Sequence, residues 1–396
     1  MVYFIYFFCG MTLCFEGVFL PEFKEYFNLN YQQQMYTMFA KNIPFVIAVG
    51  IGYFLRRIGY KNCLTVALFL YAAGTFLLVP GLSSGRYGMV LLAFFTIGIG
   101  FNFQLVAGNP LLSALGDPSG GSSRLNLGNA LGAIAQIIAP LTLTFIIPAS
   151  VITVGDKLPY IKGLFVAISV ILLLIAILTL VLKNVDLVEG FKSQAAGVAN
   201  ATESRSLWAH PQVTLGFLTI FLILGAEAGL FGFYRNYLED PNIAGLTSHQ
   251  SQRMFTIYFG VFALGRVLGA WIQKRMKPAN TLAFSLVMAM ILMGMLMTTK
   301  GTPAVVSITA LGFFVSIFFP TLYSLAIEGM GELTAQASGL LTMGFLGCAL
   351  LPVLQGRLAD WLGIQHSFGL CFAAYLVALL YTLKGRKMKC ILSASA

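Results

Sequence analysis

The feature that most constrains this chain is a series of apolar segments, each long enough to cross a lipid bilayer. A membrane-spanning helix needs about 20 mostly apolar residues. Six such segments precede a polar stretch at 183–211, and six follow it. We therefore predict twelve transmembrane helices, at residues 1–20, 36–55, 63–82, 87–115, 125–148, 160–182, 213–238, 252–273, 280–298, 303–327, 334–355 and 366–383.

The composition points the same way and excludes most soluble classes of protein. The chain has 396 residues, of which 58% are hydrophobic and 10% are charged, whereas a soluble domain carries about 25% charged residues. The surplus apolar surface must face lipid, so the bilayer is an expected partner. The net charge is +10, but the basic residues lie in short clusters between apolar segments, and we expect no nucleic-acid binding.

The distribution of Lys and Arg predicts how the chain is oriented. With the N-terminus inside, the predicted cytosolic segments hold fourteen of these residues and the external loops hold seven. Loops rich in Lys and Arg stay on the cytosolic side of a membrane. We therefore predict that both termini lie in the cytosol.

The polar stretch at 183–211 predicts a cytosolic linker between two six-helix halves, 1–182 and 212–396. Similar residues recur in the two halves at a nearly constant offset, 211 residues from Glu16 to Glu227 and 217 residues from Gly52 to Gly269. This indicates a parallel duplication. Two repeated halves with a binding site near the bilayer midplane are typical of membrane transporters.

Nothing in the sequence is typical of an enzyme. It has no P-loop, zinc motif or nucleophile elbow. The three histidines lie in predicted loops, and the six cysteines form no CxxC pair. We expect no catalytic residue, no metal site, no disulfide and no cofactor other than a proton or sodium ion that drives transport.

Charged residues inside the predicted helices are candidates for function, because such a group costs about 2.5 kcal/mol or more unless it is paired or faces water. Glu16 and Lys41 lie at similar depths in neighbouring antiparallel helices, so we predict an ion pair between them. Separate contacts with external water are the alternative. Glu227 lies among uncharged residues and is the predicted proton carrier, whereas Arg266 is expected to bind carbonyl groups near the cytosolic end.

Uncharged polar residues in the helices predict the substrate class. Amide groups both donate and accept hydrogen bonds, as sugar hydroxyls do, and aromatic walls suit the apolar face of a sugar ring. Hydrogen bonding between helices is the alternative role for each amide. The candidate substrate-binding residues are Gln104, Asn109, Asn126, Asn129, Gln136, Glu227, Asn236 and Tyr323, and Asn102 shares the helix of the first two.

Three blocks of sequence resemble the fucose–galactose–glucose:proton symporter family of the major facilitator superfamily. They are AGNPLLSALGDPSGGSSRLNLGNALG at 107–132, LGAEAGLFGFYRNYLEDPNIAGL at 224–246 and FFPTLYSLAIEGMGELTAQASGL at 318–340. Asn126 matches the Asn of the family's RLN block, and Glu227 matches the acid of its glucose/galactose branch. Gly17 stands where the fucose permeases have Asp, and Gln104 stands where they have Glu, so the resemblance is closer to the glucose/galactose branch.

The resemblance implies an all-α membrane protein with the major facilitator fold, twelve transmembrane helices and two six-helix halves. It also implies import of a hexose or hexose derivative by symport with a proton or sodium ion. We further expect a monomer in a bacterial inner membrane. Two alternatives stay open: an exporter of drugs or metabolites on the same fold, and a membrane sugar sensor that does not transport.

Overall fold

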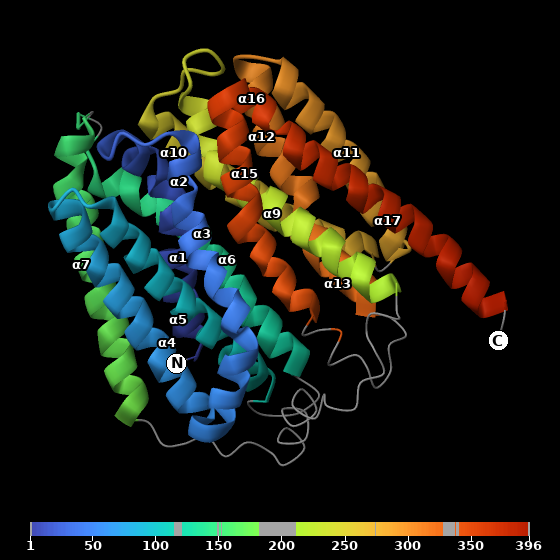
Figure 1. Ribbon diagram of the computed structural model, residues 1–396, viewed down its shortest axis with the longest axis horizontal. Coiled ribbons are helices and arrows are strands. Elements are labelled where there is room, and N and C mark those ends of the chain that lie inside the picture. Colours follow the sequence, from blue (N-terminus) through green and yellow to red (C-terminus); the bar gives the residue numbers. More distant parts are fainter. Residues whose placement is uncertain are drawn as a thin grey trace. The chain divides into compact units, whose positions relative to one another are not determined.

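The computed structural model describes residues 2–114, 121–148, 150–151, 153–181, 211–273, 275–327, 337 and 340–394 (Figure 1). These residues form α-helices and short 3-10 helices joined by tight loops, and no β-strand occurs among them. The predicted all-α fold is confirmed. The predicted linker at 183–211 lies outside the described residues except for Pro211, which begins a helix.

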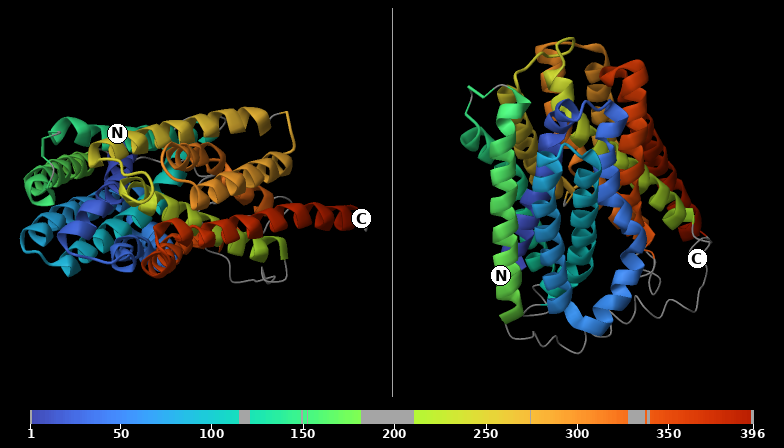
Figure 2. Two further views of the ribbon diagram at one scale, coloured as in Figure 1. Left: turned by 90° about the horizontal axis from the view of Figure 1, so that it is seen from above. Right: turned by 60° about the vertical axis from the view of Figure 1, so that its left-hand side comes forward.

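The chain divides into two compact units, Met1–Asn200 and Ala201–Ala396, which Figure 2 shows from two further sides. The helices of the first unit are α1 (Val2–Tyr26), α2 (Tyr31–Gln34), α3 (Tyr36–Asn42), η1 (Ile43–Ile47), α4 (Ala48–Ser83), α5 (Tyr87–Ala114), α6 (Gly121–Ile146) and α7 (Val154–Val181). The helices of the second unit are α9 (Pro211–Glu239), α10 (Ser248–Gln273), α11 (Pro278–Thr298), α12 (Thr302–Val315), α13 (Phe318–Ile327), η5 (Met343–Leu346), α15 (Gly347–Leu362), α16 (Ile364–Ser367) and α17 (Gly369–Ala394).

Ten helical segments of the described residues are long and apolar enough to cross a membrane. Helix α6 adds a shorter apolar segment, Leu131–Ile146, and α3, η1 and the start of α4 cover the second predicted helix. These segments account for the twelve predicted helices. Their outward faces carry large apolar side chains, such as Leu174 and Val181 of α7, which are 60% and 78% exposed. A surface of this kind requires lipid around it, and the protein is an integral membrane protein.

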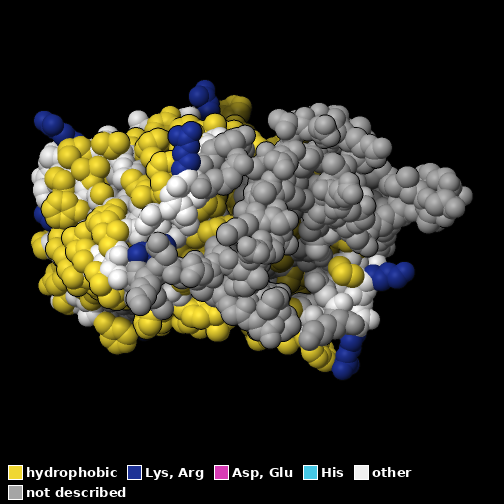
Figure 3. All heavy atoms as spheres, turned by 90° about the horizontal axis from the view of Figure 1, so that it is seen from below, with side chains coloured by type: hydrophobic (Ala, Val, Ile, Leu, Met, Phe, Trp, Pro, Cys, Tyr) yellow, Lys and Arg dark blue, Asp and Glu magenta, His cyan; other side chains and the backbone are white. Residues whose placement is uncertain are grey.

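Lys and Arg side chains are visible on one face of the described structure. On the face shown in Figure 3, the charged side chains in view among the described residues are Lys and Arg, with hydrophobic side chains around them. This is the end at which α4 turns and α7 ends in Figure 1. Lys61 of α4 donates a hydrogen bond of 3.0 Å to the carbonyl oxygen of Leu180, in the last turn of α7, where carbonyl groups lack helical partners. By the positive-inside rule this would be the cytosolic end, which stays a prediction.

The second and third predicted helices are joined by a single residue. Helix α4 contains Gly59, whose φ of 80° and ψ of 167° are not helical. A positive φ is readily adopted only by glycine, so this residue divides α4 into two limbs. The residues on both sides of Gly59 are helical, so each limb continues up to this turn. The interval 56–62 between the second and third predicted helices therefore contains the turn, but its other residues are helical.

The first helix is longer than the sequence predicts. Helix α1 ends at Tyr26 rather than near Leu20, and Pro21 lies inside it. The charged residues that follow the apolar segment do not end the helix, because hydropathy marks only the part that lipid surrounds. Glu16 therefore lies ten residues before the end of α1. At 1.5 Å per residue this is about 15 Å from the end of the helix.

Matching glycine contacts in the two units support the duplication. A methyl group added to Gly10 of α1 would lie 2.8 Å from the carbonyl oxygen of Gly132 in α6. A methyl group added to Gly225 of α9 would lie 2.7 Å from the carbonyl oxygen of Gly347 in α15. Small residues at a crossing allow membrane helices to approach closely. The offset between the two pairs is 215 residues for both helices (225 − 10 and 347 − 132), so the two crossings are equivalent.

A matching tyrosine contact lies near the other end of the same helices. Tyr26 donates a hydrogen bond of 2.9 Å to a carbonyl oxygen at the end of α4. Tyr237 donates one of 2.6 Å to a carbonyl oxygen at the end of α11. These tyrosines are 211 residues apart, as are Glu16 and Glu227. The glycine pairs have an offset of 215 residues and the acids an offset of 211. The difference of four residues is about one helical turn, so Glu16 and Glu227 lie on the same face of equivalent helices.

Candidate functional site

An ion pair lies inside the first unit. Lys41 Nζ of α3 donates a hydrogen bond to Glu16 Oε2 of α1, and the two side chains are 11% and 0% exposed. This is the ion pair that the sequence predicts from the similar depths of Glu16 and Lys41 in two neighbouring antiparallel helices. Pairing offsets much of the cost of burying each charge. Glu16 Oε1 is buried and has no hydrogen-bond partner among the described residues, so the carboxylate has one acceptor position that these residues do not use.

A break in the second helix sets the place of Lys41. Helix α3 ends one residue after Lys41, and the 3-10 helix η1 follows, with Pro44 in its first turn. Helix α5 supports this break. Asn102 Nδ2 donates a hydrogen bond of 2.6 Å to the carbonyl oxygen of Pro44, and a methyl group added to Gly98 would lie 1.9 Å from the carbonyl oxygen of Lys41. The backbone of Lys41 therefore packs directly on α5 while its side chain extends to Glu16.

Two of the predicted amides of the first unit have described side chains. Gln104 of α5 is buried, and its Oε1 accepts a hydrogen bond of 3.0 Å from the Tyr71 hydroxyl of α4. Gln136 of α6 is half-buried, and its backbone carbonyl oxygen accepts a hydrogen bond of 3.4 Å from the thiol of Cys14. The Gln104 amide thus takes part in a contact between helices, which is the alternative role that the sequence left open. The Gln136 contact uses its backbone, so the role of its amide stays a prediction.

The other three amides of the first unit are described only through their backbones. Asn109 belongs to α5, and Asn126 and Asn129 belong to α6. Their side chains lie outside the described part of the structure. Their part in substrate binding stays a prediction.

Glu227 of α9 lies in an aromatic part of the second unit and is half-buried. Tyr258 and Arg266 of α10 and Tyr375 of α17 are near enough to interact with it electrostatically. Among the described residues, none forms an ion pair or a hydrogen bond with its carboxyl group. Glu16 has a fixed partner in Lys41, whereas Glu227 has no such partner among the described residues. A group that takes up and releases a proton needs this freedom.

Arg266 is bound to backbone, as the sequence suggests. Its Nε donates a hydrogen bond of 3.2 Å to the carbonyl oxygen of Ser316. Its guanidinium carbon lies 4.8 Å from the centre of the Phe262 ring, in the range of a cation–π contact. These contacts hold the guanidinium within the second unit.

The remaining two candidates lie elsewhere in the second unit. Asn236 is half-buried on α9, nine residues after Glu227. Nine residues are about two and a half turns, so Asn236 lies on the opposite face of the helix from Glu227. Tyr323 of α13 is half-buried and packs against Phe319, with ring centres 5.7 Å apart. Whether either residue binds substrate stays a prediction.

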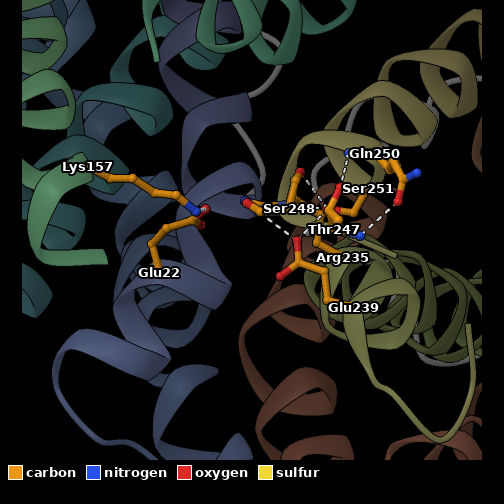
Figure 4. Close-up of polar contacts among 8 residues, drawn as sticks. All are labelled: Glu22, Lys157, Arg235, Glu239, Thr247, Ser248, Gln250 and Ser251. Atoms are coloured by element: carbon orange, nitrogen blue, oxygen red, sulfur yellow. Dashed lines mark hydrogen bonds and ion pairs between the residues drawn. The ribbon is translucent and has the colours of Figure 1, made fainter. Parts of the chain in front are cut away.

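A buried polar cluster at the end of α9 was not identified from the sequence (Figure 4). Arg235 is 1% exposed, and its guanidinium donates hydrogen bonds of 2.6 Å to Glu239, 2.9 Å to Ser248 and 3.3 Å to Ser251. Ser251 also donates a hydrogen bond to Glu239. The cluster joins the last turn of α9 to the first turn of α10. The spacing of four residues between Arg235 and Glu239 places them on one helix face and could have indicated the pair.

A second ion pair, between α1 and α7, was also missed (Figure 4). Lys157 Nζ lies 3.8 Å from Glu22 Oε1, and both side chains are buried. The helix predicted at 160–182 starts earlier than expected, because α7 begins at Val154 and includes Lys157. The backbone N–H of Asp156 donates a hydrogen bond of 3.3 Å to the Thr153 hydroxyl. Thr followed three residues later by an acid is a signature of a helix N-terminus and could have located this start.

Comparison with known sequences places the chain in a family. The Major Facilitator Superfamily profile matches residues 2–347. The glucose/galactose transporter of Brucella abortus biovar 1 (strain 9-941) is 31% identical over 386 residues, which cover 97% of this chain and 92% of the relative. The L-fucose-proton symporter of Escherichia coli (strain K12) is 27% identical over 385 residues, which cover 91% of this chain and 87% of the relative.

A solved structure shares the fold. The crystal structure of FucP, a Major Facilitator Superfamily transporter in the outward conformation, aligns with a TM-score of 0.67 and covers 97% of each chain. The sequence identity of this pair is 22%, so the likeness shows the fold alone. The profile match covers most of the chain, and the Brucella relative aligns over nearly its full length. This chain belongs to the Major Facilitator Superfamily.

Proposed function

We propose that this protein is a secondary active transporter that imports a hexose or a hexose derivative together with a cation. The observation that carries the proposal is the 31% identity to a relative named glucose/galactose transporter, over 97% of this chain and 92% of the relative. Similarity over this length involves both units of the chain. A second relative is named a proton symporter, which supports the proton as the coupling ion, with sodium as the alternative.

The transport cycle that fits such a protein is alternating access. Two halves, 1–182 and 212–396, rock around a binding site near the midplane and are joined by a cytosolic linker at 183–211. The protein acts as a monomer in a bacterial inner membrane, with both termini in the cytosol. The Lys and Arg side chains in view in Figure 3 support this orientation.

The two membrane acids have different roles in this proposal. Glu16 is already paired with Lys41, and a cation beside a carboxylate favours its charged form. The pair shapes the first half of the site. Glu227 has no such fixed partner among the described residues, so it is the coupling residue, which binds the ion on one side of the membrane and releases it on the other.

The sugar is held by amides and an aromatic wall. Gln104 of α5 has its Oε1 occupied by Tyr71, and its Nε2 group would donate to a sugar oxygen. Asn109 of α5 and Asn126 of α6 supply further amides from the same and the next helix. Tyr323 supplies a ring for the apolar face of the sugar. Asn129, Gln136, Glu227 and Asn236 complete the proposed set.

The test is uptake of labelled sugars into proteoliposomes that contain the purified protein. D-glucose, D-galactose and L-fucose are offered with an imposed proton gradient, with an imposed sodium gradient, and with neither. The expected result is accumulation of at least one sugar with the proton gradient and its loss on adding a protonophore. Accumulation with the sodium gradient alone would identify sodium, instead of the proton, as the coupling ion. Failure of every sugar to enter or exchange would overturn the proposal in favour of an exporter or a sensor.

One variant tests the amide site directly. Asn126→Ala should weaken sugar binding by about tenfold, because a lost buried hydrogen bond costs about 1–3 kcal/mol. The measurement is the sugar concentration that half-saturates exchange. Asn242→Ala, which truncates an exposed amide in the α9–α10 loop, is the matched control and should leave the affinity unchanged. An unchanged affinity in Asn126→Ala would place the sugar elsewhere.

A further inference from the structure

The hydrogen bond between Tyr71 and Gln104 joins two helices inside the first unit. The Tyr71 hydroxyl of α4 donates to Gln104 Oε1 of α5 at 3.0 Å. Tyr71 is fully buried, and Gln104 is 4% exposed. An amide side chain has one acceptor oxygen and two N–H donors, so this contact uses only one side of the Gln104 amide. A contact between helices and a contact with sugar are therefore compatible for this residue.

Helix α5 leaves room for the Tyr71 ring. Gly100 and Gln104 are four residues apart, so they lie on the same face of α5, about 6 Å apart along its axis. A methyl group added to Gly100 would lie 3.2 Å from Tyr71 Cδ2. The ring thus lies directly against Gly100, and its hydroxyl reaches Gln104 one turn further along the same helix.

The direction of this hydrogen bond fixes the orientation of the Gln104 amide. If the amide were turned over, its Nε2 would donate to the phenol oxygen of Tyr71. The phenol proton would then have only the thiol of Cys9, which interacts with Tyr71, and sulfur is a weak acceptor. A buried donor without a good acceptor is destabilising, so the pairing of the hydroxyl with Oε1 is favoured.

The other polar groups beside this face of α5 do not occupy the Gln104 amide. Tyr6 of α1 lies one turn beyond Gln104, where its hydroxyl oxygen would be 2.7 Å from a methyl group added to Gly108. It makes no hydrogen bond with Gln104. Among the described residues, none accepts a hydrogen bond from Gln104 Nε2. Buried polar groups usually have partners, and an oxygen atom of a bound ligand would supply one here.

We propose that Tyr71 is a positioning residue for sugar recognition: it fixes the Gln104 amide so that N–H donors, and not the carbonyl oxygen, are presented to one oxygen of the sugar. The inference rests on the proposed function and deepens it. Without the phenol hydroxyl the amide can turn over and present either group. The bound sugar must then immobilise the side chain itself, which weakens binding.

The test is a cycle of variants measured by exchange of labelled D-glucose and D-galactose in proteoliposomes. Tyr71→Phe keeps the ring and removes the donor, Gln104→Ala removes the amide, and a third protein carries both changes. The half-saturating sugar concentration reports binding, and the maximal exchange rate reports alternation. The control is Tyr26→Phe, which removes another phenol hydrogen bond of the first unit, at 2.9 Å to the carbonyl oxygen of Leu82 in α4.

The half-saturating concentration should rise about tenfold in Gln104→Ala, the effect of one lost hydrogen bond, and about fivefold in Tyr71→Phe, the effect of immobilising one side chain. The maximal rate should stay within about twofold. The double variant should resemble Gln104→Ala, because the tyrosine acts only through the amide, whereas independent effects would multiply to about fiftyfold. The control should bind sugar like the wild type.

Competing analogues that each lack one hydroxyl give a second measurement. Gln104→Ala should remove the preference for one hydroxyl, and Tyr71→Phe should weaken the preference for the same one. The inference is overturned if Tyr71→Phe binds sugar like the wild type, if its effect multiplies with that of Gln104→Ala, or if it lowers the maximal rate instead of affinity. These outcomes leave the proposed function intact. A wild-type protein that exchanges no sugar refutes the proposed function and this inference with it.

Discussion

The Glu16–Lys41 pair allows a quantitative test of how charge is stabilised in this protein. Lys41→Met removes the one hydrogen-bond partner that the described residues give to Glu16, whose other oxygen has none and whose side chain is 0% exposed. An unpaired charge is then left in a dry site, which costs about 3–5 kcal/mol. Glu16→Gln leaves the ammonium of Lys41, 11% exposed, with a neutral amide in place of its counter-ion.

The double variant is the informative one. With Glu16→Gln and Lys41→Met together, no charge remains to be compensated. The loss in the free energy of unfolding should not exceed that of the worse single variant. The coupling energy should therefore be about 3 kcal/mol, because replacing a buried pair by neutral groups is far less costly than breaking it. A neutral hydrogen bond between membrane helices is worth about 0.6 kcal/mol on average, so the cycle distinguishes the two interactions.

The assay is denaturant unfolding of the purified protein in mild detergent, with the free energy extrapolated linearly to zero denaturant. A control cycle pairs Glu16→Gln with Lys162→Met, because Lys162 is half-buried and its Nζ contacts Ser83 at 3.5 Å instead of an acid. Independent sites add to within about 0.5 kcal/mol, so the control coupling should be near zero. A coupling energy near zero in the Glu16–Lys41 cycle would refute the reasoning.

Three further outcomes are expected. Glu227→Gln should keep sugar exchange and lose gradient-driven accumulation in proteoliposomes; accumulation at the wild-type level would remove it as the coupling residue. Cysteines introduced at Ser204 and Lys300 should react with an impermeant thiol reagent from opposite sides of the membrane, and labelling from one side would contradict the topology. Gly98→Ala should lower the free energy of unfolding by about 1–3 kcal/mol, since its methyl group would overlap a carbonyl oxygen at 1.9 Å, whereas Gly294→Ala, with open space beside it, should not.

The fold could be predicted from the sequence because lipid selects long apolar helices. The apolar runs therefore gave the number and order of the helices. Their ends were less predictable. Helix α1 continues past Pro21 to Tyr26 because backbone hydrogen bonds extend a helix beyond the lipid. At Gly59, a single positive φ replaces the expected loop, and the identity of the glycine does not distinguish this turn from ordinary close packing.

The candidate site could be predicted where burial forces a charge to find a partner. The pairing of Glu16 with Lys41 follows from that cost. The cluster around Arg235 could not be assigned in the same way, because two of its three acceptors are serines of the next helix and hydropathy does not indicate which hydroxyls face inward.

The single-residue turn at Gly59 can act as a hinge between the two limbs of α4. One residue of extended chain spans at most about 3.6 Å, so a longer displacement of one limb of α4 along its axis must pull the other limb with it. Rotation about the backbone bonds of Gly59 is comparatively free, because no side chain opposes it. The two limbs can therefore pivot against each other but cannot slide apart. Because the first limb follows η1 and the segment that carries Lys41, a displacement of the third helix along its axis must move that segment as well, whereas a tilt can be absorbed at Gly59.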